Sequence, residues 1–308
     1  MAVQVNFEKC AGGGLCAESR CNVGVEKEEI MRTKELVNLR KWFRHYIRQF
    51  AQKGNRLHPL LQLKAHHSER VAKEARALAS DLGWSLGYRN AAEALGLLHD
   101  TGRFSQFAER RTFADTMSFD HGECGWAITR KIAPLSCLPR AERKRILDGI
   151  RYHNRRVIPD TIAPQHRAFL HLIRDADKLD IFRVTLESVE RNGFQDLPDM
   201  LPDITLDRAP SPAIIQELYR RQTCSLRKVK SLGDFFVMQL SWIYDLHYAP
   251  TRQRIVERGI LSRILGLIDG DVRVQDFGVQ LHQWINSRLG EKAGKTEGCK
   301  VHLRIPVR

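Results

Sequence analysis

The sequence predicts an all-α protein, and three observations support this. Apolar residues recur every three or four positions over most of the chain, as they do on one face of an α-helix. Alternation of apolar and polar residues, which would predict β-strands, is found only in the last residues, KVHLRIPVR. The chain also contains no internal repeat, so a bundle of unlike helices is expected.

The helical pattern divides the chain of 308 residues into four parts. The first has no periodicity and is expected to be a flexible extension; its Cys10, Cys16 and Cys21 do not have the spacing of a common zinc site. The second has the most regular helices and is the predicted main domain. A C-terminal helical region that packs on this domain and a short tail follow. The four parts are residues 1–32, 33–190, 191–290 and 291–308.

Residues that begin and end helices place the individual elements. Gly54 and Gly83 are expected to end the first two helices, and Asp120 with Glu123 is typical of a helix start. A segment with several prolines, 192–212, predicts a long loop. The predicted helices run from 33 to before 54, over 60–82 and 89–99, from 120 onward, and over 140–153, 165–189, 213–230, 232–247, 250–267 and 271–289.

The composition indicates an ordinary globular protein with a strong positive charge. Hydrophobic residues make up 43% of the chain and the formal net charge is +14, which favours phosphorylated small molecules, nucleic acid or anionic surfaces as partners. No apolar run approaches the roughly 20 residues that span a membrane, and the first residues do not resemble a secretory signal. We therefore expect a cytoplasmic protein whose seven cysteines are reduced.

Histidines and aspartates recur on, or at the ends of, the apolar faces of the predicted helices. A single histidine on such a face is usually a core residue. A buried aspartate, however, costs several kcal/mol unless it is paired or binds a metal. One shared cation would explain the whole set, and imidazole and carboxylate ligands suit Mn, Fe, Ni, Co or Zn. The set consists of His67, His99, Asp100, His121, His153 and Asp177.

Three separated motifs resemble the HD-domain superfamily of metal-dependent phosphohydrolases. These are HHSERVAKEARALA, LLHDTGR at 97–103 and RDADKLD at 174–180, and the resemblance covers roughly residues 57–190. The family's spacing selects His67 rather than His66 as the first ligand. It selects Asp177 as the last, which leaves Asp175 and Asp180 to orient a ligand or to form salt bridges.

Two further histidines lie between the HD pair and the last aspartate. The order H…HD…H…H…D resembles the two-metal members of the superfamily, which implies that Asp100 bridges two metals. His67, His99 and Asp177 would then complete one site, and His121 and His153 would hold the other metal. In the alternative interpretation, His121 and His153 are a helix cap and a surface residue, or contact substrate phosphate in a one-metal enzyme. The implied cofactor is thus one or two divalent ions per chain, of Mn, Fe, Ni, Co, Zn or Mg.

The resemblance implies hydrolysis of a phosphomonoester or phosphodiester by metal-activated water. The expected substrate is an anionic phosphorylated small molecule, with a nucleotide as the favoured class. Asp100, Arg103 and Lys178 are the candidate catalytic residues; for the last two, a salt bridge is an equally good interpretation. As a group, Arg151, Arg155 and Arg156 would make the rim beside His153 positive.

Comparison with the signatures of known subfamilies disfavours two substrates but selects none. The Glu-Asp pair of enzymes that hydrolyse guanosine tetraphosphate does not follow this HD pair, and YHNRRVIPD lacks the signature of cyclic-di-GMP phosphodiesterases. Two rival functions share the ligand set: a diiron oxygenase of the same superfamily and a nucleotide-binding regulatory protein. Nucleic acid is not favoured, because a nucleic-acid role rests on the net charge alone. The sequence leaves the oligomeric state open.

Overall fold

The computed structural model describes residues 31–289 except 53, 196–203, 222–223 and 269. Throughout these residues the fold is helical, as the sequence predicts, and the only β-type pairing is an isolated bridge between Thr205 and Ser231. The predicted N-terminal extension, with its cysteines Cys10, Cys16 and Cys21, lies outside the described residues except for its last two positions, and the predicted tail lies outside them entirely. No helix in the described part of the chain has the length and apolarity needed to cross a membrane.

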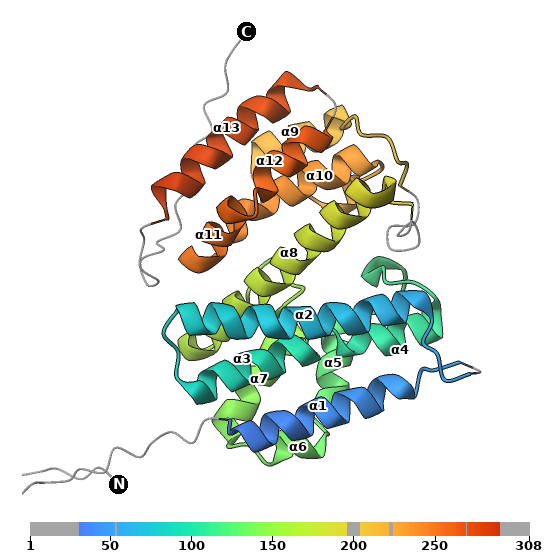
Figure 1. Cartoon of the computed structure of the whole chain (residues 1–308), viewed down its shortest axis with the longest axis vertical. Coiled ribbons are helices and arrows are strands. Elements are labelled where there is room, and N and C mark those ends of the chain that lie inside the picture. The colour runs from blue at the N-terminus through green and yellow to red at the C-terminus, as the bar shows by residue number, and fades with distance from the viewer. Residues whose placement is uncertain (1–30, 53, 196–203, 222–223, 269, 290–308) are drawn as a thin grey trace, which may run out of the picture.

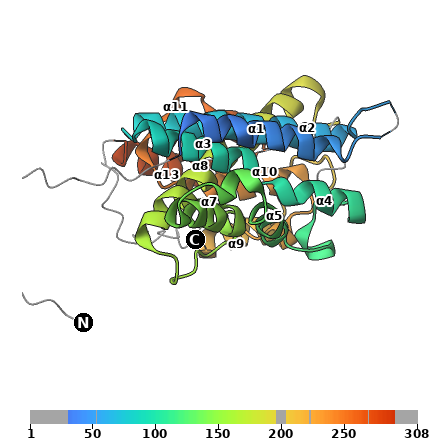
Figure 2. The same ribbon diagram turned by 90° about the horizontal axis from the view of Figure 1, so that it is seen from below.

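The first half of the chain forms a bundle that ends with the long helix α8 (Figure 1). In Figure 2, α1 and α2 lie on the opposite side of this bundle from α5 and α7. The helices are α1 (Thr33–Arg48), α2 (Pro59–Asp81), α3 (Leu86–Leu98), α4 (Thr101–Arg110), α5 (His121–Thr129), α6 (Ala133–Ser136), α7 (Arg140–Tyr152) and α8 (Pro164–Asn192), with a short 3₁₀ turn, η1, at Asp115–Met117.

Helices α2 and α3 pack closely enough that a side chain is excluded between them. A Cβ atom on Gly96 would lie 2.6 Å from the Cα of Ala72, so the two backbones touch at this point. Helix α2 begins with Pro59, whose missing N–H needs no partner in the first turn, and it buries Val71 and Leu78 completely. This contact fixes α2 against α3, the two helices that deliver the first three residues of the predicted metal set.

The C-terminal helices pack along α8. They are α9 (Pro212–Arg221), α10 (Leu232–Ser241), α11 (Ala249–Glu257), α12 (Ile260–Leu267) and α13 (Val272–Ser287), with 3₁₀ turns η3 (Leu226–Lys228) and η4 (Trp242–Asp245). The buried carboxylate of Asp175 on α8 anchors them: it accepts hydrogen bonds from the backbone N–H groups of His247 and Tyr248 and from the hydroxyl of Thr251. The predicted division of the chain into four parts stays a prediction.

Several predicted boundaries were wrong. Helix α4 was not predicted, because it follows the HD pair directly and contains Gly102; its amphipathic character comes from Phe104 and Phe107. The predicted helix over 250–267 is two helices, since Gly259 adopts a left-handed backbone (φ +58°) between α11 and α12. Similarly, the predicted 232–247 helix changes to a 3₁₀ turn at Trp242.

Candidate metal centre

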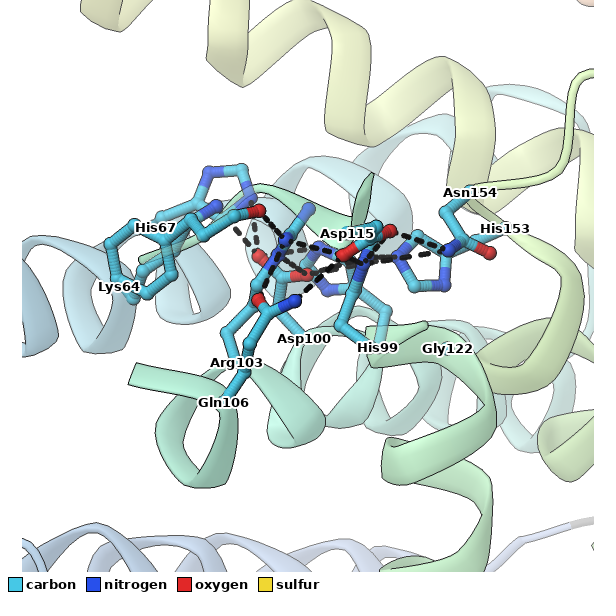
Figure 3. Close-up of polar contacts among 12 residues, drawn as sticks. Lys64, His67, His99, Asp100, Arg103, Gln106, Asp115, Gly122, His153 and Asn154 are labelled. Carbon is cyan, nitrogen blue, oxygen red and sulfur yellow. Dashed lines mark hydrogen bonds and ion pairs between the residues drawn. The ribbon is translucent and has the colours of Figure 1, made fainter. Parts of the chain in front are cut away.

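Five segments of the chain bring the six predicted ligands to one place in the bundle. Figure 3 shows four of them, His67, His99, Asp100 and His153, with the side chains around them. His67 comes from α2, and His99 and Asp100 form the junction between α3 and α4. His121 is the first residue of α5, His153 caps the C-terminus of α7, and Asp177 lies on α8. All six are buried except Asp177, which is half-buried. Neighbouring His66 is exposed, which agrees with the choice of His67.

The two oxygens of Asp100 face different pairs of histidines. Oδ2 lies 3.7 Å from Nε2 of His67 and 3.8 Å from Nε2 of His99. Oδ1 lies 3.4 Å from Nε2 of His121 and 3.7 Å from Nε2 of His153. Asp177 joins the first pair, with its Oδ1 3.0 Å from His67 and 3.6 Å from His99. The carboxylate of Asp100 therefore stands between two potential metal sites.

Every histidine of the set has its outer nitrogen, Nδ1, held by an acceptor. The carbonyl oxygens of Gly96 and Ile150 accept from His99 and His153, at 2.7 and 2.8 Å. Since a carbonyl only accepts, Nδ1 of these two rings carries a proton and donates, which turns Nε2 toward the centre.

Carboxylates hold the other two rings in the same way. Asp180 Oδ2 lies 2.7 Å from Nδ1 of His67, and Asp115 Oδ2 lies 2.8 Å from Nδ1 of His121. Because an ionised carboxylate only accepts, Nδ1 of each ring carries a proton and Nε2 points toward the centre. At His67, burial and the charge of Lys64 would lower the pKa of the ring, but the carboxylates of Asp177 and Asp180 outweigh them and raise it. A carboxylate or carbonyl on the outer nitrogen is what orients most metal-binding histidines in proteins.

Unpaired buried nitrogens test whether a cation fits this centre. Nε2 of His67 and Nε2 of His99 are buried and make no hydrogen bond of acceptable geometry with any described residue. Nε2 of His121 lies 3.0 Å from Nε2 of His153, and the outer nitrogen of each ring is already held by an acceptor. A divalent cation within reach of these atoms would satisfy all four nitrogens, so the residues fit one or two metal ions.

The ionisation of the central groups also suits metal binding. Burial alone would raise the pKa of Asp100, but the positive side chains of Lys64 and Arg103 and the nearby imidazoles outweigh it and hold that pKa well below its usual value. Burial, reinforced by the charge of Arg103, lowers the pKa of His121 to about 4. Near neutral pH the centre therefore offers anionic carboxylates and, at His121, a neutral imidazole.

Two residues at the centre were missed by the sequence analysis. Lys64 is buried and donates from Nζ to Asp100 Oδ2 at 2.9 Å; it precedes His67 by three residues on α2, a spacing that could have revealed it. Asp115 holds His121 and also accepts from Gln106 and Asn154. It lies in a stretch without helical periodicity, where the sequence gives no signal.

The predicted catalytic cations both form ion pairs. Arg103 Nη1 lies 3.0 Å from Asp115 Oδ1 and its Nε lies 3.6 Å from Asp100 Oδ1. Lys178 donates to Asp245 Oδ2 at 2.7 Å, outside the centre. The rim arginines are paired as well, Arg151 with Glu123 and Arg155 with Asp120.

A glycine permits the close approach of α4 and α5 that places Asp100 beside His121. A Cβ atom on Gly102 would lie 2.1 Å from the carbonyl oxygen of His121 and 2.7 Å from the backbone nitrogen of Gly125. Both neighbours are backbone atoms, so no side-chain rotation can make room. The glycine in the HDTG sequence is thus a packing requirement of the centre.

The helical fold and the centre agree with the comparison with known families. Residues 65–181 match the family model of the HD domain. The chain therefore contains an HD domain, with His67, His99, Asp100, His121 and His153 gathered as a metal-site cluster. No curated protein and no solved structure matches the chain.

Proposed function

We propose that this protein is a metal-dependent phosphohydrolase that acts on a phosphomonoester or phosphodiester, with a nucleotide as the favoured substrate class. The observation that supports this best is the inward orientation of four histidines around Asp100, each with its outer nitrogen held. A divalent cation bound there would supply Lewis acidity, which lowers the pKa of water and offsets charge on phosphoryl oxygens.

The proposed ligands form two groups, one facing each carboxylate oxygen of Asp100. His67, His99 and Asp177 would hold one ion, His121 and His153 would hold the other, and Asp100 would contact both. With four rings oriented before any ion arrives, little reorganisation is needed on binding. Imidazole and carboxylate ligands together suit Mn, Fe, Ni, Co and Zn, and Mg is a candidate through the carboxylates.

Lys64 and Arg103 are the cations best placed to bind a phosphoryl group. Both flank the Asp100 carboxylate, and each lies over the Phe113 ring, at 5.7 Å (Lys64 Nζ) and 6.0 Å (Arg103 Cζ) from its centroid. The substrate-binding role of Arg103, and that of Lys178, would require each to exchange its carboxylate partner for a phosphate. If they do not exchange, Arg103 positions Asp115 and through it His121.

Elemental analysis of protein purified without chelator tests the two-ion centre. The unaltered chain is expected to hold two metal ions, and His121→Ala and His153→Ala are each expected to reduce this to about one. A metal content that both variants leave unchanged would show that these histidines have another role. The metal-loaded protein is then assayed on a panel of phosphoesters with and without oxygen. Hydrolysis without oxygen supports the proposal, whereas iron content with oxygen consumption would favour a diiron oxygenase.

Removing the charge that orients His67 should weaken metal binding. Asp180 accepts from His67 Nδ1 and is held by Arg70 at 2.7 and 2.9 Å, which together outweigh burial and lower its pKa to about 2. Asp180→Asn is expected to reduce metal affinity by about 10–100-fold, measured by competition with a chelator. The control is Glu187→Gln, which removes a surface carboxylate that also pairs with an arginine of α8; it should leave metal affinity unchanged. Equal affinity in both variants would contradict the role of Asp180.

A further inference from the structure

A polar cavity of about 470 Å³ lies away from the metal centre, at the end of the bundle where α1 and α3 begin and α2 ends. Figure 1 shows these three helix ends together on one side of the bundle. The volume of the cavity is within the usual range for small-molecule sites. None of the six predicted metal ligands is among its lining residues.

Positive side chains from three helices line this cavity. They are Arg40 of α1, Lys73 and Arg76 of α2, and Arg89 of α3, against a single carboxylate, Glu93. Four positive groups and one negative group leave an excess of three positive charges. Glu93 is buried and holds two of the cations, Arg40 and Arg76, so it fixes their guanidinium groups at the wall of the cavity.

The other two cations keep hydrogen-bonding capacity for a ligand. The buried Nε–H of Arg89 has no hydrogen-bond partner among the described residues, and its Nη1 makes only a long contact of 3.4 Å with Ser80. Lys73 is exposed at the rim, and no ion pair joins it to another described residue. A buried N–H without an acceptor is destabilising, and an anion in the cavity would supply the missing acceptor.

The chemistry of the walls selects a compact polyanion. Arginine binds phosphate and carboxylate through paired N–H groups, and three arginines with one lysine suit several anionic oxygens at once. The lining residues include no aromatic side chain, so a nucleobase would find no ring to stack on. We propose that this cavity binds the diphosphate or polyphosphate group of a small molecule. The proposal does not depend on the phosphohydrolase function.

The cavity lies on α2 and α3, the two helices that also carry proposed metal ligands, but at a distance from those ligands. Lys73 and Arg76 follow His67 on α2 by six and nine residues, about 9 and 14 Å along the helix axis. Glu93 precedes His99 on α3 by six residues. The backbone contact of Gly96 with Ala72 lies between the cavity and the ligands on both helices. The cavity is therefore a separate site from the metal centre, on shared helices.

Isothermal titration calorimetry with inorganic pyrophosphate tests the site on the full chain. The buffer contains no divalent cation, because pyrophosphate chelates such ions. Saturable binding with one molecule per chain is expected. Lys73→Gln with Arg89→Gln should raise the Kd by about tenfold or more, since two charge-assisted contacts are lost. The matched control, Lys41→Gln with Arg44→Gln on the exposed face of α1, removes the same charge outside the cavity and should change the Kd less than twofold.

Four outcomes would overturn the proposal. Equal weakening in the test and control variants would mean attraction by net charge alone. Loss of binding in Arg103→Gln, with none in the cavity variant, would place pyrophosphate at the metal centre. Citrate binding as tightly as pyrophosphate would mean a carboxylate site, and binding of a polyglutamate peptide with no binding of pyrophosphate would mean a peptide site. The metal content of the cavity variant, measured alongside, should equal that of the unaltered chain, so a failure here is separate from a failure of the phosphohydrolase proposal.

Discussion

Asp100→Ala is expected to abolish metal binding and to lower phosphoesterase activity by about 10³-fold or more. Both oxygens of Asp100 face histidine nitrogens, so the variant removes a ligand from each half of the centre. Without the ions, several kcal/mol of transition-state stabilisation are lost, and every 1.4 kcal/mol is about a factor of ten in rate. Elemental analysis and the rate on the best phosphoester of the panel measure the two effects.

Stability must be separated from chemistry in this variant. Removing Asp100 leaves the buried Nζ of Lys64 without its partner, and breaking a buried ion pair costs about 3–5 kcal/mol. The double variant Asp100→Ala with Lys64→Met removes both charges and should restore much of the stability without restoring metal. Helix content, from circular dichroism, should then match the unaltered chain. Asp160→Ala, at a fully exposed carboxylate, is the control for both properties. Stoichiometric metal in the double variant would disprove the central role of Asp100.

The sequence predicts most of this centre because its ligands follow local rules. His67 is in phase with the apolar stripe of α2, and His99 with Asp100 ends the apolar run of α3. The groups that orient the rings are harder to predict. The acceptors for His99 and His153 are backbone carbonyls, which every residue has, and Asp115 reaches His121 from a segment without periodicity. Tertiary contact, not spacing, selects them.

The same distinction separates the correct from the incorrect parts of the predicted fold. Long amphipathic helices such as α2 and α8 were predicted to within a few residues, because many turns repeat the same pattern. Helix α4 was missed because Gly102 is a poor helix former, and the packing of α4 against α5 outweighs that preference. Nor does any spacing predict that Asp175, two residues before the proposed ligand Asp177, binds the backbone of the C-terminal region instead.

Asp175→Ala is expected to be the most destabilising single substitution on the C-terminal side of α8. The side chain is fully buried, and burial raises the pKa of its carboxyl group despite the charge of Lys178 and the donors around it. The variant would leave three buried donors unsatisfied, two of them backbone N–H groups, at about 1–3 kcal/mol each. A loss of at least about 3 kcal/mol corresponds to a Tm lower by about 6–12 °C, measured by thermal unfolding followed by circular dichroism.

A graded series distinguishes this interpretation from general damage to α8. Thr251→Val removes one of the three donors and keeps the carboxylate, so it should cost only about 1 kcal/mol. Asp276→Ala, at an exposed position on α13, should leave the Tm unchanged. If Asp175→Ala lowered the Tm no more than Thr251→Val does, the hydrogen bonds to His247 and Tyr248 would contribute nothing. The attachment of the C-terminal region would then rest on apolar packing and on ion pairs such as that of Lys178 with Asp245. If instead the Tm falls most in Asp175→Ala, less in Thr251→Val and not at all in Asp276→Ala, a single buried carboxylate on α8 attaches the helix that bears Asp177 to the region that follows it.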